Sequence, residues 1–270
     1  MKEWTILTKT ALITGASTGI GLDLAVLAAR DGFDCILVAR SEPRLHELKK
    51  VLEKRYTINV HVFALDLSEH NAVKRLTNAI DAAGLTVDFL INNAGFGTAG
   101  EFIELDAETE AEEVRLNVNA LTELTKAYLP DMVARNHGYV LNVASVAAFQ
   151  PGPYMAVYYA TKAYVLSLTE ALHAETKGTG VNVSVLCPGP TDTGFFNRAG
   201  SEMMVSKMPS HLVAFFGYKG VMKNKRVIIP GLSNQALVGL AKIMPRAVSL
   251  EILRRFQKPT DASVEQLPTS

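Results

Sequence analysis

This 270-residue chain lacks disulfide-forming cysteines, an excess of either charge and long apolar runs. Its two cysteines, Cys35 and Cys187, lie in short apolar runs, which favours buried reduced thiols over a disulfide. Because 27 basic side chains balance 27 acidic ones, the net charge favours neither nucleic acid nor an anionic membrane as a partner. No run approaches the roughly 18 apolar residues of a membrane-spanning helix, and the first residues lack a secretory signal. We therefore expect a cytoplasmic protein with no integral membrane segment.

What the chain does contain is a series of short apolar runs, separated by stretches with helical periodicity. The runs are rich in β-branched residues and almost continuously apolar, as strands buried on both faces are. They begin at Thr10, Cys35, Val60, Val87, Tyr139, Val181 and Arg226. Strand followed by helix, repeated, predicts a parallel sheet covered on both faces. We expect a single doubly wound α/β domain of the Rossmann type over residues 1–258, with a seven-stranded, mostly parallel sheet and a flexible tail at 259–270.

Two glycine clusters compete as the phosphate site of such a fold. Gly95, Gly97 and Gly100 form a literal G-x-G-x-x-G, but acidic residues follow directly and Asp106 is typical of the cap of a later helix. The stretch TGASTGIG, residues 14–21, follows the first strand and opens the first helix, where backbone N–H groups and the helix dipole favour an anion. We prefer this second cluster, although a tight strand-to-helix turn without a ligand would also contain such glycines.

The end of the second predicted strand indicates which dinucleotide binds. In dinucleotide folds an acidic residue there accepts a hydrogen bond from the ribose 2′-hydroxyl. This chain has Ala39 followed by Arg40 instead, and a guanidinium suits a 2′-phosphate because its planar fork matches phosphate oxygens. NADP(H) is therefore favoured over NAD(H); an arginine that is merely solvated is the alternative.

One lysine in the stretch SVAAFQPGPYMAVYYATKAY, residues 145–164, has two tyrosines at helical spacing. If the chain is helical from about residue 153, Tyr158 lies four residues before Lys162 and Tyr159 lies three before it. The spacing leaves open which phenol is placed for chemistry. It also leaves open a helix with a packing tyrosine and a solvated lysine and no chemistry at all.

The motifs, taken in order, resemble those of the short-chain dehydrogenase/reductase family. The matching positions are Thr14–Gly21 for the glycine turn, Asp66 after the third strand, Asn92–Gly95 for N-N-A-G, Ser145 for the serine, Tyr158–Lys162 for Y-x-x-x-K, and Pro188–Gly189 after the sixth strand. Each motif is weak alone, whereas the ordered set, over about residues 8–230, is specific. The resemblance selects Tyr158 over Tyr159. The two helices expected at about 232–257 resemble the C-terminal extension of a bacterial-type branch of the family.

The site that the resemblance implies has catalytic, cofactor-binding and substrate parts, and no metal. Its catalytic residues are Asn117, Ser145, Tyr158 and Lys162. Its cofactor-binding residues are Gly15, Ser17, Thr18, Gly19, Ile20, Gly21, Arg40, Asp66, Leu67, Asn93, Ala94, Gly95, Tyr158, Lys162, Pro188, Gly189, Thr191 and Thr193.

The catalytic asparagine requires a choice between Asn117 and Asn119. The family pattern of asparagine, two residues and a small residue selects Asn117, with Ala120 as the small residue. Periodicity agrees, because Asn117 falls within the expected buried stripe of this helix and Asn119 does not. We take that stripe to be Val114, Val118, Leu121 and Leu124. The resemblance implies that Asn117 holds a water chain to the lysine, while a purely structural hydrogen-bond network is the alternative.

The reaction implied is hydride transfer between nicotinamide and a carbonyl or alcohol carbon. Tyr158 would give a proton to the oxygen during reduction and accept one during oxidation. Lys162, together with the oxidised nicotinamide, would lower the pKa of that phenol and would hold the nicotinamide ribose. Ser145 would donate a hydrogen bond to the substrate oxygen, where negative charge grows.

The substrate end of the chain is apolar. A loop expected at about 190–215 contains Phe195, Phe196, Met203, Met204 and Met208, which suits a bulky apolar carbonyl compound, although packing explains such residues equally well. In the last expected helix, Val248, Ile252 and Phe256 form an apolar side that fits a cap on the cleft, a subunit contact or a membrane surface. We favour packing.

The leading hypothesis is an NADPH-dependent carbonyl reductase that acts as a homodimer or homotetramer. The alternatives are an oxidation-direction dehydrogenase, an epimerase on the same scaffold, and a non-catalytic NADP-binding regulator.

Overall fold

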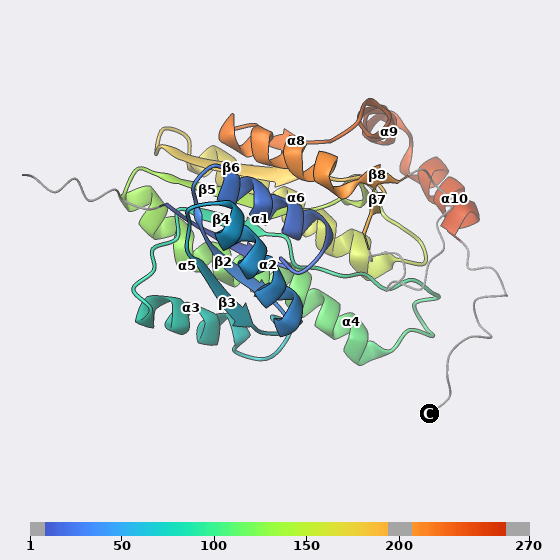
Figure 1. Ribbon diagram of the computed structural model, residues 1–270. Coiled ribbons are helices and arrows are strands. Elements are labelled where there is room, and N and C mark those ends of the chain that lie inside the picture. The colour runs from blue at the N-terminus through green and yellow to red at the C-terminus, as the bar shows by residue number, and fades with distance from the viewer. Residues whose placement is uncertain (1–8, 194–206, 258–270) are drawn as a thin grey trace, which may run out of the picture.

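The computed structural model describes residues 9–193 and 207–257, and its centre is a seven-stranded sheet (Figure 1). The strands run β3-β2-β1-β4-β5-β6-β9, and every neighbouring pair in this sheet is parallel. Their bounds are Thr10–Thr14 (β1), Asp34–Ala39 (β2), Val60–Ala64 (β3), Phe89–Asn92 (β4), Gly138–Val143 (β5), Val181–Leu186 (β6) and Val227–Ile228 (β9). The predicted strands and the doubly wound α/β fold are therefore confirmed.

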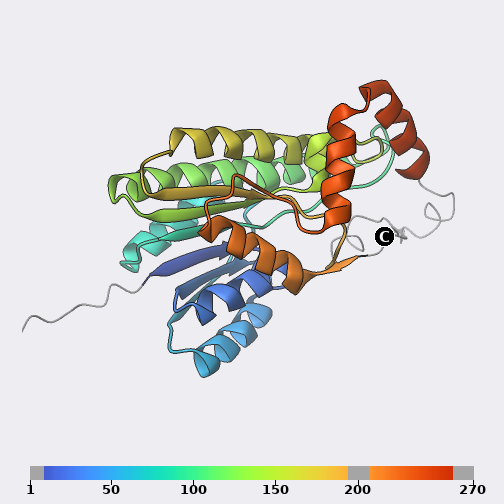
Figure 2. The ribbon, with the colours of Figure 1, turned by 90° about the horizontal axis from the view of Figure 1, so that it is seen from above.

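Helices cover both faces of this sheet, as Figure 2 shows. On one face lie α1 (Gly19–Arg30), α2 (Glu42–Arg55) and α8 (Ser210–Met222). On the other lie α3 (Ala72–Ala82), α5 (Leu121–Ala134) and α6 (Ala156–Glu175). Successive residues of one strand serve opposite cores, because side chains alternate along a strand. Ile13 packs in the α1 layer and Leu12 packs in the α3 and α5 layer.

A π-helical turn, Arg115–Ala120, joins α4 (Ala107–Val114) to α5. A π turn contains an extra residue, so it rotates the helix face relative to a regular helix. The expected buried stripe is therefore wrong at its start: Val114 is exposed, and Glu113 is buried in its place. The expected difference in burial between the two asparagines is nevertheless present, because Asn117 is buried and Asn119 is exposed.

Two features lie near the carboxyl ends of the strands. A small parallel pair, β7 (Thr191–Asp192) and β8 (Met208–Pro209), was not expected. The two expected C-terminal helices are present as α9 (Leu232–Ile243) and α10 (Arg246–Gln257), and they are separated at Pro245. Val248 and Ile252 on the apolar side of the second helix are exposed in this single chain, so they do not pack against the rest of the described chain. No helix in the part of the chain described is long and apolar enough to cross a membrane.

Candidate active site

The turn between β1 and α1 has the conformation of an anion site. Gly15 and Gly19 have φ angles of 66° and 56°, a region that glycine enters without strain. Thr18, the N-cap of α1, makes no side-chain capping bond, and the first helical turn contains no acidic residue. The backbone N–H groups at this helix end are thus left to a ligand, which suits a phosphate. Ser17 and Ile20 are half-buried in the same turn.

Thr14 and Asn93 connect this turn to the loop after β4. The Thr14 hydroxyl accepts from the backbone N–H groups of Asn93 and Ala94, each at 3.0 Å. The Asn93 amide donates to the Thr14 carbonyl at 3.0 Å. A Cβ on Gly21 would collide with the Gly15 carbonyl and the Asn93 amide, so only glycine permits this approach of helix to loop. The turn is therefore held in place by packing and hydrogen bonds that need no ligand.

The other glycine cluster lies beside the catalytic residues and not at a helix start. The next helix, α4, begins at Ala107, and Asp106 caps it by accepting from the Thr109 N–H at 2.8 Å. A Cβ on Gly95 would lie 2.8 Å from Asn117 Oδ1 and 3.3 Å from Lys162 Nζ. This cluster therefore lacks the helix start that the turn after β1 has.

Arg40 extends into solvent at the end of β2, with its side chain 68% exposed. One guanidinium nitrogen lies 3.6 Å from Asp66 Oδ2. The other carboxylate oxygen of Asp66 accepts from the backbone and hydroxyl of Ser68. An exposed ion pair of this length contributes little to stability. Arg40 is therefore available to a phosphate at this edge of the sheet.

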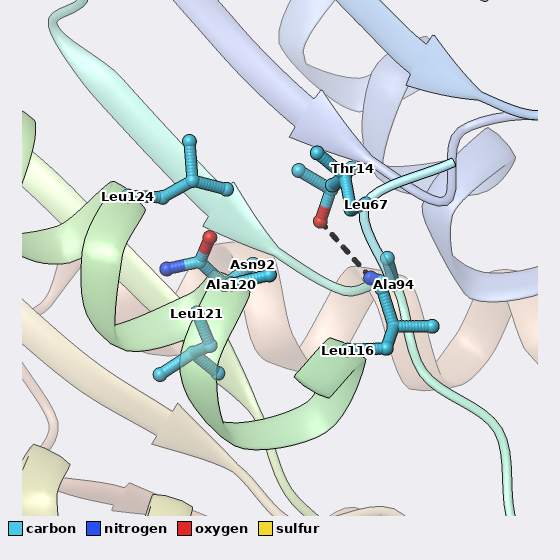
Figure 3. A pocket seen from close by; sticks show the side chains of 8 residues that line it. All are labelled: Thr14, Leu67, Asn92, Ala94, Leu116, Ala120, Leu121 and Leu124. Atoms are coloured by element: carbon cyan, nitrogen blue, oxygen red, sulfur yellow. Dashed lines mark hydrogen bonds between the residues drawn. The ribbon is translucent and has the colours of Figure 1, made fainter. Parts of the chain in front are cut away.

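Leu67 and Ala94 line a small internal cavity of about 10 Å³ between β1, β4 and the start of α5 (Figure 3). Leu67 is buried within the core there. The Thr14 hydroxyl points into the same space, where Figure 3 marks its bond with the Ala94 N–H. A volume of this size holds about one water molecule, so the cavity is not the substrate site.

Asn117 is held in the π-helical turn by three hydrogen bonds. Its Nδ2 donates to the Phe96 carbonyl at 2.8 Å and to the Thr161 hydroxyl at 3.1 Å, and its Oδ1 accepts from the Phe96 N–H at 3.2 Å. Thr161 in turn donates to the carbonyl of Tyr158. The asparagine thus links the loop after β4 to α6, the helix of Tyr158 and Lys162.

Lys162 is buried on α6, where its ammonium donates to the Val143 carbonyl at 3.0 Å. Its Nζ lies 5.7 Å from the centre of the Tyr158 ring. Burial lowers the pKa of Lys162 to about 8, against opposing contributions from Glu113 and Cys187. The lysine therefore depends on its neighbours to stay charged at neutral pH.

Tyr158 and Ser145 face each other across the end of β5. Ser145 caps a short 3₁₀ turn by accepting from the Ala147 N–H at 3.1 Å, and its hydroxyl lies 3.4 Å from the Pro188 carbonyl. Burial raises the pKa of the Tyr158 phenol, and a hydrogen bond with Ser145 acts in the opposite direction. Without a dinucleotide, this phenol stays protonated at neutral pH.

Tyr159 has a structural partner instead. Its hydroxyl accepts a hydrogen bond from the amide of Gln257, at the end of α10, and its ring packs against Gly152. Burial raises its pKa as well. Of the two tyrosines at helical spacing from the lysine, only Tyr158 therefore lies with the serine.

The segment after β6 closes the site over the glycine turn. The Thr191 hydroxyl donates to the Gly189 carbonyl at 2.9 Å, and Gly189 lies against Asn234 of α9. A Cβ on Gly19 would lie 2.7 Å from Thr193, so this segment approaches the turn closely. Half of the expected substrate loop lies outside the described residues, including Phe195, Phe196, Met203 and Met204, whereas Met208 is half-buried in β8.

Sequence reasoning missed Glu113, which is fully buried in α4 one turn before Asn117. The spacing of four residues puts both on one helix face. The four-residue spacing from Asn117 was the signal that could have indicated a buried Glu113. A glutamate at such a position is, however, usually interpreted as a solvated charge. Glu113 is also among the causes of the pKa change at Lys162.

An anion turn at the switch point of a doubly wound sheet, next to a Ser-Tyr-Lys-Asn group, defines a dinucleotide-dependent oxidoreductase. The comparisons agree. The chain belongs to the short chain dehydrogenase family, whose sequence model matches residues 9–203. The family uses a nicotinamide cofactor, and solved structures that resemble this chain contain NADPH or NAD.

Three solved structures of this family resemble the chain over most of its length. A short-chain dehydrogenase from Sphingobium yanoikuyae in complex with NADPH is 32% identical, with a TM-score of 0.78 over 88% of this chain and 97% of that one. The bulky-bulky ketone specific alcohol dehydrogenase from Comamonas testosteroni is 30% identical, with a TM-score of 0.74 over 88% and 96%. A family member from Burkholderia phymatum in complex with NAD is 26% identical, with a TM-score of 0.77 over 94% and 98%.

Proposed function

We propose that the protein is an NADPH-dependent carbonyl reductase that acts on a bulky apolar ketone or aldehyde. The observation that carries the proposal is the convergence of Ser145, Tyr158, Lys162 and Asn117 beside the glycine turn. These four side chains come from the turn after β5, from α6 and from the π-helical turn, and they meet at the carboxyl edge of the sheet.

Bound nicotinamide would supply the hydride. The protein must supply the proton and stabilise the negative charge that develops on the substrate oxygen. Tyr158 donates its phenolic proton to the substrate oxygen, and Ser145 donates a hydrogen bond to the same oxygen, where negative charge grows. The Lys162 ammonium favours the phenolate that results. Asn117, through its bonds to Phe96 and Thr161, fixes the lysine's surroundings.

The electrostatics of the site support reduction over oxidation as the main direction. Burial raises the pKa of Tyr158 in the ligand-free protein, so the phenol is ready to donate and not to accept a proton. An oxidation-direction dehydrogenase or an epimerase would need the phenolate at the start of the reaction. Net consumption of NADPH with a ketone, without recycling, separates the reductase from both alternatives.

The preference for NADPH rests on Arg40. Its guanidinium is exposed at the edge of the sheet where the adenosine ribose binds in this fold, and Ala39 before it provides no carboxylate for a 2′-hydroxyl. The likeness to a protein that binds NADPH supports this choice. The likeness to one that binds NAD makes the ratio of kcat/KM for NADPH over NADH the decisive measurement.

The proposed substrate class rests on apolar residues at the substrate end and on the likeness to an alcohol dehydrogenase specific for bulky ketones. NADPH oxidation against a panel of aryl ketones, steroid-like ketones, aldehydes and small sugars tests it directly. We expect the highest kcat/KM for the bulky apolar members. Turnover confined to small polar sugars would overturn the substrate class, and no turnover of any carbonyl would overturn the function.

We also propose a homo-oligomer. Leu232 and Ile243, at the two ends of α9, are 83% and 80% exposed, as apolar side chains at a subunit contact are in one isolated chain. Sedimentation velocity on the purified protein tests this: a dimer or tetramer is expected, and a monomer would refute it.

A further inference from the structure

Two glutamates of α4 are buried behind the catalytic lysine. Glu113 has no exposed surface and Glu110 is 9% exposed. They lie three residues apart and therefore on one face of the helix. One carboxylate oxygen of each, Glu113 Oε1 and Glu110 Oε2, has no hydrogen-bond partner in the part of the chain that the structure describes. Buried carboxyl groups are rare, so this pair needs an explanation.

Thr98 connects the two carboxyl groups. Its hydroxyl lies 3.0 Å from Glu113 Oε2 and also within hydrogen-bond distance of Glu110 Oε1. Its backbone N–H donates to Glu113 Oε2 at 3.0 Å. A hydroxyl has one hydrogen, so it can donate to only one of the two oxygens. Both contacts are hydrogen bonds at the same time only when one carboxyl group is protonated and donates to the Thr98 oxygen.

The charge of this pair acts on the catalytic residues. Glu113 raises the pKa of Lys162 and of Tyr158, both on α6, which packs against α4. Burial raises the pKa of Glu113 itself to about 7; hydrogen bonds from Thr98 oppose this change, Glu110 adds to it and Lys162 opposes it. Cys187 also acts on Lys162. Because its pKa is near neutrality, Glu113 can change charge over the pH range in which the enzyme works.

We propose that Glu113 is a positioning residue for proton transfer, which shares one proton with Glu110 across the Thr98 hydroxyl and keeps Lys162 charged once that proton has left to solvent. The proposal rests on the proposed function, because it acts through the lysine that favours the Tyr158 phenolate. It adds a third ionisation to the site, in a group that touches neither substrate nor cofactor.

The coupling can be measured without any substrate, by NMR titration of the protein labelled with ¹³C at its glutamate carboxyl groups. Comparison with Glu113→Gln assigns the Glu113 signal. In the wild-type protein we expect it to titrate at about 7. Lys162→Met removes the nearby positive charge and should raise that midpoint by about one pH unit. Glu110→Gln removes the competing carboxyl group and should lower it.

The matched control is Glu112→Gln, a half-buried neighbour on the same helix, which should leave the Glu113 midpoint unchanged. A Glu113 midpoint at the ordinary value of 4.5 would overturn the shared proton. A Glu113 titration midpoint that is the same in Lys162→Met as in the wild-type protein would overturn the coupling. Two charges that interact must change each other's pKa by equal amounts.

Kinetics give the second readout. The loss of kcat in Glu113→Gln should be smallest below about pH 6, where Glu113 is protonated in the wild-type protein. On the alkaline side its kcat should fall at a pH about one unit lower, because Lys162 has lost its negative neighbour. An equal loss of kcat at every pH would indicate a structural role and overturn the proposal. A wild-type protein that reduces no carbonyl, yet shows the Lys162→Met shift, would remove the proposed function and still support the coupling.

Discussion

Glu113→Gln should make the folded protein more stable at alkaline pH. The side chain is fully buried, and glutamine keeps its size and has a carbonyl oxygen that can still accept from Thr98. The substitution removes a group whose ionised form burial disfavours. It therefore tests the carboxyl pair through folding alone, with no reference to activity.

The sign and size follow from the two pKa values of Glu113. Its pKa is 4.5 as the ordinary value and about 7 in the folded protein. A raised carboxyl pKa leaves stability intact below about pH 4.5 and removes it as the pH rises toward 7. The full difference corresponds to about 3 kcal/mol, of which about 2.5 kcal/mol is lost between about pH 5 and pH 8. The Glu113→Gln variant should not lose this stability as the pH rises.

The assay is urea unfolding of the wild-type protein and the variant at several pH values, followed by circular dichroism. The stability difference in favour of Glu113→Gln should grow with pH and level off above about pH 7.5. Glu112→Gln is the control and should follow the wild-type curve. A stability difference that is constant with pH, or that grows toward acid, would refute the assignment of a raised pKa.

The remaining predictions concern the site and the thiols. Tyr158→Phe should lower kcat by about 10²–10⁴-fold, with NADPH affinity by fluorescence titration largely unchanged; a variant as fast as wild type would exclude this tyrosine. Arg40→Asp should shift the kcat/KM ratio from NADPH toward NADH by about 10–100-fold, and an unchanged ratio would contradict the role of the guanidinium. Gly21→Ala should destabilise the protein by about 1–3 kcal/mol in the same urea assay, because the new Cβ meets the Gly15 carbonyl; an unaltered midpoint would show that the turn relaxes freely. Burial raises the pKa of Cys35 and of Cys187 to about 12, so both thiols should react with a disulfide reagent only after unfolding; rapid reaction of the native protein would contradict their burial.

The sheet was predictable because it depends on apolar runs. A strand such as Asp34–Ala39 is buried along almost its whole length and therefore has a nearly continuous apolar signal. The glycine turn was predictable for a related reason: its positive φ angles at Gly15 and Gly19 leave little choice of residue. Both features are imposed by local sterics and by burial, which a sequence records directly.

The errors arise where tertiary contacts override a local pattern. The π-helical turn at Arg115–Ala120 shifts the helix face, so a regular 3.6-residue period assigned Val114 to the core, although Glu113 is the buried residue there. The pair β7 and β8 contains only two residues in each strand, too few for a pattern. Likewise, in α10 the polar Ser249 is buried and Gln257 bonds Tyr159, while the apolar Val248 is exposed.

The contact between Gln257 and Tyr159 has a consequence for how this enzyme can diversify. The family match ends at residue 203, yet α10, more than 40 residues further along, reaches the tyrosine next to the proposed proton donor. Substitutions in this distal helix can thus reshape the wall beside Tyr158 while the proton-transfer group and the dinucleotide turn stay intact. New selectivity can arise from a part of the chain in which mutation carries little risk to the chemistry.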